Sequence, residues 1–173
     1  FVSGMDALTV GDPTDSKTNI GPLAMADIRE DLVNQMDDSI RSGARKLTRD
    51  RDLPEKGYWF APAILENAPA GSPAAEEELF GPVASLWKVD GLGDAITRAN
   101  KSPFGLGSAI FTQEQPDIEM AVRDLEAGST FVNAKVASDP RLPFGGIKQS
   151  GYGRELAIDG IRSFINRKTV SIA

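Results

Sequence analysis

The chain has 173 residues, of which 40% are hydrophobic and 25% are charged. These proportions are typical of globular proteins and exclude collagen-like, low-complexity and wholly disordered chains. Acidic residues outnumber basic ones by 25 to 19, and this negative balance argues against nucleic acid or an anionic membrane as a general partner.

The chain contains no cysteine and no histidine. Its own residues therefore offer no disulfide, no thiolate nucleophile, no Cys-ligated metal and no histidine base. No apolar stretch approaches the roughly 20 residues that cross a bilayer, and the N-terminus lacks a signal-peptide pattern, so we expect a cytoplasmic protein. The chain opens at Phe1 without an initiator Met, which suggests residues from a longer polypeptide.

The beginning of the chain is expected to hold one long helix and one edge strand. Apolar residues recur every four positions between Leu23 and Gly43, at Ile28, Leu32, Met36 and Ile40. This spacing predicts an amphipathic helix that Gly43 closes. The segment 58–65 favours a strand but contains Pro62, so it predicts an edge strand or an extended arm, and 67–75 is a predicted loop.

The middle of the chain alternates short apolar runs with segments of helical spacing. The runs cover 83–89, 108–112 and 130–133, and the helical segments cover 92–100 and 116–127. Pro116 opens the second helix and Gly128 closes it. The order strand, helix, strand, helix, strand predicts an α/β fold with parallel strands joined by right-handed crossovers.

The end of the chain combines a long irregular region with a short helix and a terminal strand. Residues 134–153 are rich in glycine and proline and predict a loop long enough to be functional. A short helix is expected from Arg154 onward, and its apolar residues Leu156, Ile158 and Ile161 are expected to face inward. Lys168–Ile172 alternates like a strand, which could pair with another subunit or with the edge of its own sheet.

Glycines crowd the segment from Phe144 to Glu155. Backbone amides could approach a ligand there, and Lys148, Ser150 and Arg154 could donate to a phosphate near a helix start. The alternative is a rigid turn packed against a neighbouring lobe. The spacing favours the turn, because the glycines do not follow a strand in the dinucleotide-binding pattern.

Three consecutive carboxylates, Glu76 to Glu78, precede the predicted strand at 83–89. Such a run is usually a solvated face, and two adjacent carboxylates can also form an acid/base pair in which one pKa is raised. A single carboxylate just outside a strand has a third use, because it can accept hydrogen bonds from a ribose diol. The sequence leaves these interpretations open.

Ser138 lies in the loop between the last apolar run and the glycine segment. Loops beyond the carboxyl ends of parallel strands bind ligands in α/β proteins. Ser138 is therefore a candidate donor to a small anionic substrate, although an ordinary turn serine would occupy the same surroundings.

Four sequence blocks together resemble the NAD(P)-dependent aldehyde dehydrogenases. They are Val10–Pro13 with Ile20–Pro22, Glu77–Val83, Phe131–Asn133 and Pro143–Glu155. The resemblance implies the parallel-sheet catalytic lobe of that α/β fold, incomplete, with residues 1–165 as a partial catalytic domain and 166–173 as an oligomerisation strand. It also implies NAD or NADP as the cofactor, a small-molecule aldehyde as the substrate, and a homo-oligomer, either a dimer or a tetramer.

The segment from Ser138 to Arg141 is similar to the succinate-semialdehyde dehydrogenase branch, in which the serine at this position binds the distal carboxylate of the substrate. The resemblance implies that Ser138 and Phe144 bind substrate. It implies that Glu78 binds the nicotinamide ribose hydroxyls and that Phe80 packs at the nicotinamide.

The family's reaction needs a cysteine thiolate, a glutamate that activates water and a Rossmann-like cofactor lobe, and the family pattern places all of them before these residues. The chain itself is therefore assigned no catalytic residue and no metal site, and it is expected to be inactive alone. The expected function is a part in the NAD(P)+-dependent oxidation of an aldehyde, succinate semialdehyde, to the acid. The alternative is a non-catalytic interaction module that keeps the family's dimerisation surface.

Overall fold

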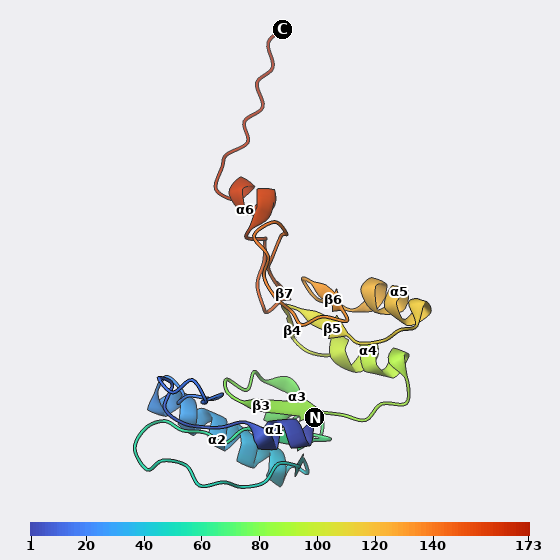
Figure 1. The fold of residues 1–173 in the computed structure, drawn as a ribbon. Helices are drawn as coiled ribbons and strands as arrows, with labels where there is room; N and C mark the ends of the chain where they lie inside the picture. The colour runs from blue at the N-terminus through green and yellow to red at the C-terminus, as the bar shows by residue number, and fades with distance from the viewer. The chain divides into compact units, whose positions relative to one another are not determined.

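The computed structural model describes residues 1–173, which form two compact units. We call Phe1–Lys88 the N-terminal unit and Val89–Ala173 the C-terminal unit (Figure 1). None of the helices is long and apolar enough to cross a membrane.

The N-terminal unit combines three helices with one mixed sheet. The helices are α1 (Val2–Ala7), α2 (Ala26–Arg41) and α3 (Pro73–Glu76), and the strands are β1 (Arg45–Lys46), β2 (Ala63–Glu66) and β3 (Val83–Leu86). The strand order is β1-β2-β3, in which β2 pairs antiparallel with β1 and parallel with β3. The mixture of parallel strands and helices confirms the predicted α/β class.

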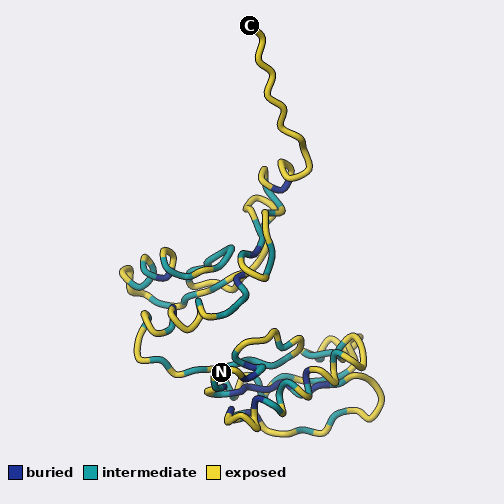
Figure 2. Tube along the Cα trace, turned by 180° about the vertical axis from the view of Figure 1, so that it is seen from behind, coloured by how far each residue is buried: buried dark blue, intermediate teal, exposed yellow.

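Strand β2 is the centre of this sheet and of its core. Ile64 and Leu65 are both 0% exposed, and buried segments follow this part of the trace in Figure 2. The prediction of an edge strand at 58–65 was therefore wrong. Pro62 directly precedes the paired residues, so its missing N–H costs the sheet no ladder bond, while Ala63 N donates to Pro82 O at 2.9 Å.

Helix α2 confirms the predicted amphipathic helix, although it begins at Ala26, three positions after the expected start at Leu23. Gly43 follows its end with a φ of +118°, a conformation that glycine adopts without strain. The buried Ser39 links α2 to α3: its Oγ donates to Gln35 O at 2.7 Å and accepts from Ala74 N at 2.9 Å. The predicted loop at 67–75 thus contains the start of a short helix.

Two arginines from a distant loop hold the C-terminal end of helix α1. Arg51 Nη1 donates to Leu8 O at 2.5 Å, and its Nη2 donates to Asp6 O at 3.0 Å. Arg49 donates from its backbone to the Asp6 carboxylate at 3.2 Å. These long-range contacts satisfy carbonyls at the helix end, which local sequence does not reveal.

The C-terminal unit contains three helices and two small sheets. The helices are α4 (Leu92–Asn100), α5 (Gln115–Asp124) and α6 (Ala157–Arg162), and the strands are β4 (Phe104–Gly105), β5 (Ser108–Ile110), β6 (Thr130–Val132) and β7 (Ile147–Lys148). Strand β5 pairs parallel with β6, and β4 pairs antiparallel with β7. Strands β4 and β7 were not expected, and β7 lies in the region predicted to be irregular.

Helix α4 has the predicted bounds, whereas α5 ends three residues before the expected Ala127. The Asn100 side chain explains the early end. Its Nδ2 donates to Asp124 O at 2.7 Å, and its Oδ1 accepts from Glu126 N at 2.9 Å. The Asn100 side chain thus satisfies the Asp124 carbonyl and the Glu126 N–H, which would otherwise bond within a further helical turn.

The three predicted strands do not continue one another in a single sheet. Strand β3 pairs with β2, whereas β5 pairs with β6. The expected strand, helix, strand, helix, strand series is therefore wrong at its first step, and only its second step, β5-α5-β6, forms a parallel pair. The other parallel pair is β2 with β3, on either side of α3. The neighbour of β3 is instead β2, whose Pro62 had suggested an edge position.

The last helix and the tail also differ from expectation. Ile158 and Ile161, predicted to face inward, are 54% and 65% exposed. The buried face of α6 is formed instead by Gly160, where a Cβ would lie 2.9 Å from the carbonyl carbon of Glu155. Residues 166–173 form no strand in the structure and are exposed (Figure 2).

Candidate functional site

The loop between α3 and β3 carries the three consecutive carboxylates, and only one of them is free. Glu76 Oε1 accepts from Gly71 N at 2.5 Å, and Glu77 Oε2 accepts from Gln35 Nε2 at 2.8 Å. The Glu78 carboxylate is exposed and makes no hydrogen bond, although its backbone oxygen accepts from Gln35 at 3.2 Å. An acid/base pair gains no support from this arrangement, whereas a single carboxylate available to a ligand does.

Phe80 follows Glu78 on the same loop and exposes 65% of its surface. The loop beneath it is pinned by backbone hydrogen bonds, from Gly81 N to Leu79 O and from Val83 N to Gly81 O, both at 2.8 Å. A Cβ on Gly81 would overlap the Leu32 side chain of α2, so glycine favours this close approach. The packing of the loop on α2 therefore leaves the aromatic ring facing solvent on a rigid support.

The predicted substrate residue Ser138 lies in the C-terminal unit, after β6. Its side chain is exposed and makes no hydrogen bond, so its hydroxyl is available to a ligand. The next residues form a closed fork, in which Arg141 donates from its backbone N and Nε to Asp139 Oδ1, both at 2.9 Å, and from Nη2 to Asp139 Oδ2 at 2.6 Å. These bonds, led by the side-chain contact, lower the pKa of Asp139 and raise that of Arg141.

Phe144 is half-buried at the start of the glycine segment, where its backbone pairs with that of Glu155 through bonds of 2.9 and 2.7 Å. Its ring lines an open, mainly apolar cleft of about 870 Å³, together with Pro140, Tyr152 and Phe164. Ser138 does not line this cleft, so the structure does not bring the two predicted substrate residues into one cavity.

The three candidate donors of the glycine segment, Lys148, Ser150 and Arg154, all contact the protein itself. Lys148 Nζ contacts Asn100 O at 2.8 Å and Glu126 Oε2 at 2.7 Å, and Ser150 Oγ accepts from Gly105 N at 3.0 Å. Arg154 Nη1 donates to the carbonyls of Gly146 and Gly153, at 3.0 and 2.6 Å. Because all three side chains already bind the protein itself, Lys148 and Arg154 as donors and Ser150 as an acceptor, the geometry favours the rigid turn over the phosphate cradle.

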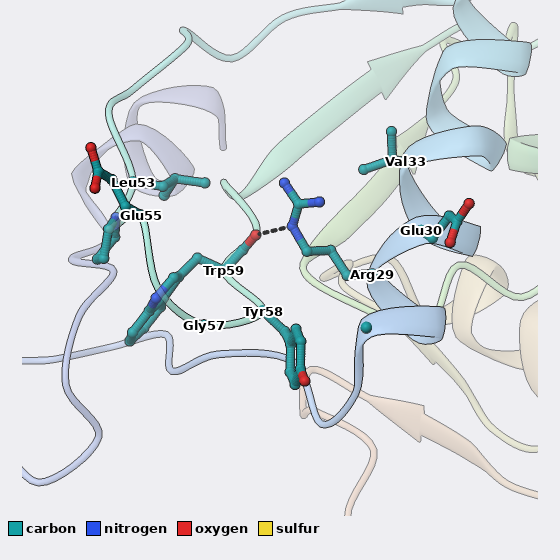
Figure 3. Close-up of a pocket in the computed structure, with 10 residues that line it drawn as sticks. Arg29, Glu30, Val33, Leu53, Glu55, Gly57, Tyr58 and Trp59 are labelled. Atoms are coloured by element: carbon teal, nitrogen blue, oxygen red, sulfur yellow. Dashed lines mark hydrogen bonds between the residues drawn. The ribbon is translucent and has the colours of Figure 1, made fainter.

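A second cavity, of about 520 Å³, lies between α2 and the loop at 53–59, and no pattern in the sequence predicted it. Figure 3 shows Arg29 reaching from α2 to the loop, where its Nε donates to Trp59 O at 2.9 Å. The carboxylates of Glu30 and Glu55 lie on opposite sides of this cavity and do not converge (Figure 3). The arrangement is a bridge between helix and loop rather than a cluster of reactive groups.

Comparison with known proteins agrees with this picture. The model of the aldehyde dehydrogenase family matches residues 1–170. The chain is 45% identical over 170 residues to succinate-semialdehyde dehydrogenase [NADP(+)] 1 of Mycobacterium ulcerans, and 42% identical over 172 residues to the succinate-semialdehyde dehydrogenase [NADP(+)] of Mycobacterium avium. These alignments cover 98% and 99% of this chain, but 37% and 36% of the relatives.

Among solved structures, the chain is similar to the succinic semialdehyde dehydrogenase of Streptococcus pyogenes, determined with NADP+ as the cofactor. The identity is 34% and the TM-score is 0.92, over 99% of this chain and 38% of that one. The chain therefore spans less than two-fifths of the length of the relatives that it matches. On the evidence of the family model and of both comparisons, the chain belongs to the aldehyde dehydrogenase family.

Proposed function

We propose that these residues form part of an NADP-dependent enzyme that oxidises succinate semialdehyde to the carboxylic acid. The similarity to relatives with that activity gives the proposal its substrate and its cofactor. The observation that carries it on the structural side is the free carboxylate of Glu78 beside the exposed ring of Phe80. These are the two unengaged groups on a loop that is otherwise fully tied down.

Glu78 fits a cofactor role because an unpaired carboxylate can accept two hydrogen bonds from a ribose diol. Phe80 offers a flat apolar surface on which an aromatic ring can pack. When bound, the nicotinamide would accept the hydride removed from the aldehyde carbon. The relatives' use of NADP favours NADP over NAD among the two cofactors predicted.

Ser138 fits a substrate role because its hydroxyl has no partner and can donate to the distal carboxylate of succinate semialdehyde. Phe144 contributes an apolar surface to a cleft that Ser138 does not line, so its proposed substrate role rests on the family resemblance. The chain itself has no cysteine, so the thiolate that attacks the aldehyde must come from residues other than these.

A chimera tests this proposal. In it, the part of the Mycobacterium ulcerans relative that aligns with this chain, 37% of its length, is replaced by this chain. The chimera is expected to reduce NADP+ with succinate semialdehyde at a rate within about tenfold of the unaltered relative, because the replaced part is 45% identical. The 173-residue chain alone is expected to show no such activity. A folded but inactive chimera, or an active isolated chain, would contradict the proposal.

We further propose that residues 1–165 belong to the catalytic domain and that 166–173 pair with a neighbouring subunit. Val170 and Ile172 lie on one side of this alternating segment and are 70% and 91% exposed. Such a segment can add a strand to the edge of another sheet. The cytoplasmic location stays a prediction.

Light scattering on the chimera checks the proposed strand. Replacing Val170 and Ile172 together by Asp is expected to halve the particle mass or reduce it further, because charges would enter a paired apolar face. The control is Ser171→Asp, which places a charge on the opposite side of the segment. Equal masses for both variants and the parent chimera would remove the oligomerisation role.

A further inference from the structure

We propose that Asp139 and Arg141 are positioning residues, which hold the Ser138 loop in the one arrangement that selects aldehydes bearing a distal carboxylate. This inference rests on the proposed function. It concerns two residues to which neither the family resemblance nor the comparisons give a role.

Asp139 and Arg141 close a turn of three residues through several hydrogen bonds. Three hydrogen bonds of 2.6 to 2.9 Å join Arg141 to the Asp139 carboxylate, and Leu142 N donates to Asp139 O at 2.9 Å. Pro140, between them, has a fixed φ, and its carbonyl accepts from Ala157 N at 3.1 Å. The loop is therefore closed on itself and fastened to the start of α6.

Ser138 directly precedes this closed turn. Its side chain has no hydrogen bond and lies outside the Phe144 cleft, so its direction follows from the backbone of the adjoining Asp139. A hydroxyl that must meet a carboxylate gains from such fixed geometry, since its orientation is settled before the substrate arrives.

The pair also neutralises the charge nearest to Ser138. The Arg141 side chain is 85% exposed, and without Asp139 its guanidinium would be free to change its direction. With Asp139 in place, two of its three nitrogens are occupied. The substrate carboxylate is then recognised by the Ser138 hydroxyl, whose position is fixed by the backbone.

Stability is a poor explanation for the pair. An exposed ion pair is screened by solvent and contributes too little to decide whether the chain folds. Removing the pair should therefore leave folding intact and expose the effect on position. This separation makes the inference testable by kinetics and by proteolysis.

The kinetic test uses the chimera with Asp139→Asn, Arg141→Gln and both changes together. Each of the three is expected to raise KM for succinate semialdehyde by about fivefold, with kcat and the KM for butanal unchanged, because butanal lacks the distal carboxylate. An equal effect in the single and double variants is expected if the pair acts as one device. Unchanged KM values, equal shifts for both substrates, or additive effects would overturn the inference.

A second readout needs no activity. In the isolated chain, Asp139→Asn is expected to speed trypsin cleavage after Arg141 several-fold, because the guanidinium is released, while cleavage after the exposed Arg41 keeps its rate as an internal control. Unchanged cleavage overturns the positioning role whatever the chimera does. An inactive parent chimera with faster cleavage would refute the proposed function and the selectivity, and would leave the pair as an ordering device of the loop.

Discussion

Replacing Gly128 by alanine is expected to unfold the C-terminal unit while the N-terminal unit stays folded. A Cβ at this position would overlap the carbonyl oxygen of Gly145 and lie 2.8 Å from its carbonyl carbon, with Leu106 O at 3.1 Å. These neighbours are backbone atoms, which cannot turn aside as a side chain can. Gly128 cannot retreat either, because its N–H donates to Gly105 O at 2.9 Å. The expected loss is about 4 kcal/mol or more, at the upper end of single substitutions.

Tryptophan fluorescence follows the unfolding of the N-terminal unit separately from that of the C-terminal unit. Trp59 and Trp87 are the only tryptophans and both belong to the N-terminal unit. Gly128→Ala should therefore lower the far-UV circular dichroism and leave the tryptophan fluorescence transition in urea unchanged. Gly93→Ala is the matched control, since a Cβ there meets no atom within 4 Å and helix α4 gains about 1 kcal/mol from alanine. If Gly128→Ala keeps the far-UV dichroism of the parent chain, the C-terminal unit accommodates the added methyl group and the prediction is wrong.

Leu32 and Gly81 are expected to be strongly coupled, because one fills the space that the other leaves open. Leu32 is 1% exposed, and a Cβ on Gly81 would overlap its Cδ2. Leu32→Ala should cost the N-terminal unit about 2 to 5 kcal/mol through the cavity it creates. Gly81→Ala should cost about 1 to 3 kcal/mol through overpacking. The double variant should cost clearly less than the sum, since the new methyl group enters the cavity.

Urea unfolding followed by tryptophan fluorescence measures this cycle. Asn34→Ala, on the exposed side of α2, is the control and should change the free energy of unfolding by less than about 0.5 kcal/mol. Additive costs for Leu32→Ala and Gly81→Ala would mean that the loop moves away from α2 instead of sharing its space. The result matters for the site because Phe80 directly precedes Gly81 on that loop.

Local patterns in the sequence identify helices well and strand partners poorly. Helix α4 has the predicted bounds because its periodicity and its ends lie within a few residues of one another. The pairing of β3 with β2 joins residues about twenty positions apart, and no local pattern specifies it. Ile158 and Ile161 were expected inside because they are apolar, but the close contact in α6 is made by Gly160. Apolar character alone does not say which face has a partner.

In the candidate site, too, local features were predictable from the sequence and long-range contacts were not. The sequence indicated that one glutamate among three could serve a ribose, but only the structure shows that Glu76 and Glu77 are bound to Gly71 and Gln35. Gln35 lies more than forty residues away, so its contact could not be read from spacing. The fork between Asp139 and Arg141, in contrast, is local, and its short spacing is visible in the sequence once the loop is known to close.

A crossed comparison of Michaelis constants tests the central claim most directly. In the chimera, Glu78→Gln is expected to raise KM for NADP+ about tenfold, the effect of one charge-assisted hydrogen bond of about 1.5 kcal/mol, and to leave KM for succinate semialdehyde unchanged. Ser138→Ala is expected to do the reverse by a similar factor. Glu77→Gln, whose carboxylate already serves Gln35, should change neither constant. If Glu78→Gln and Ser138→Ala shift both constants alike, or neither, these residues do not divide cofactor and substrate between them and the assignment is wrong.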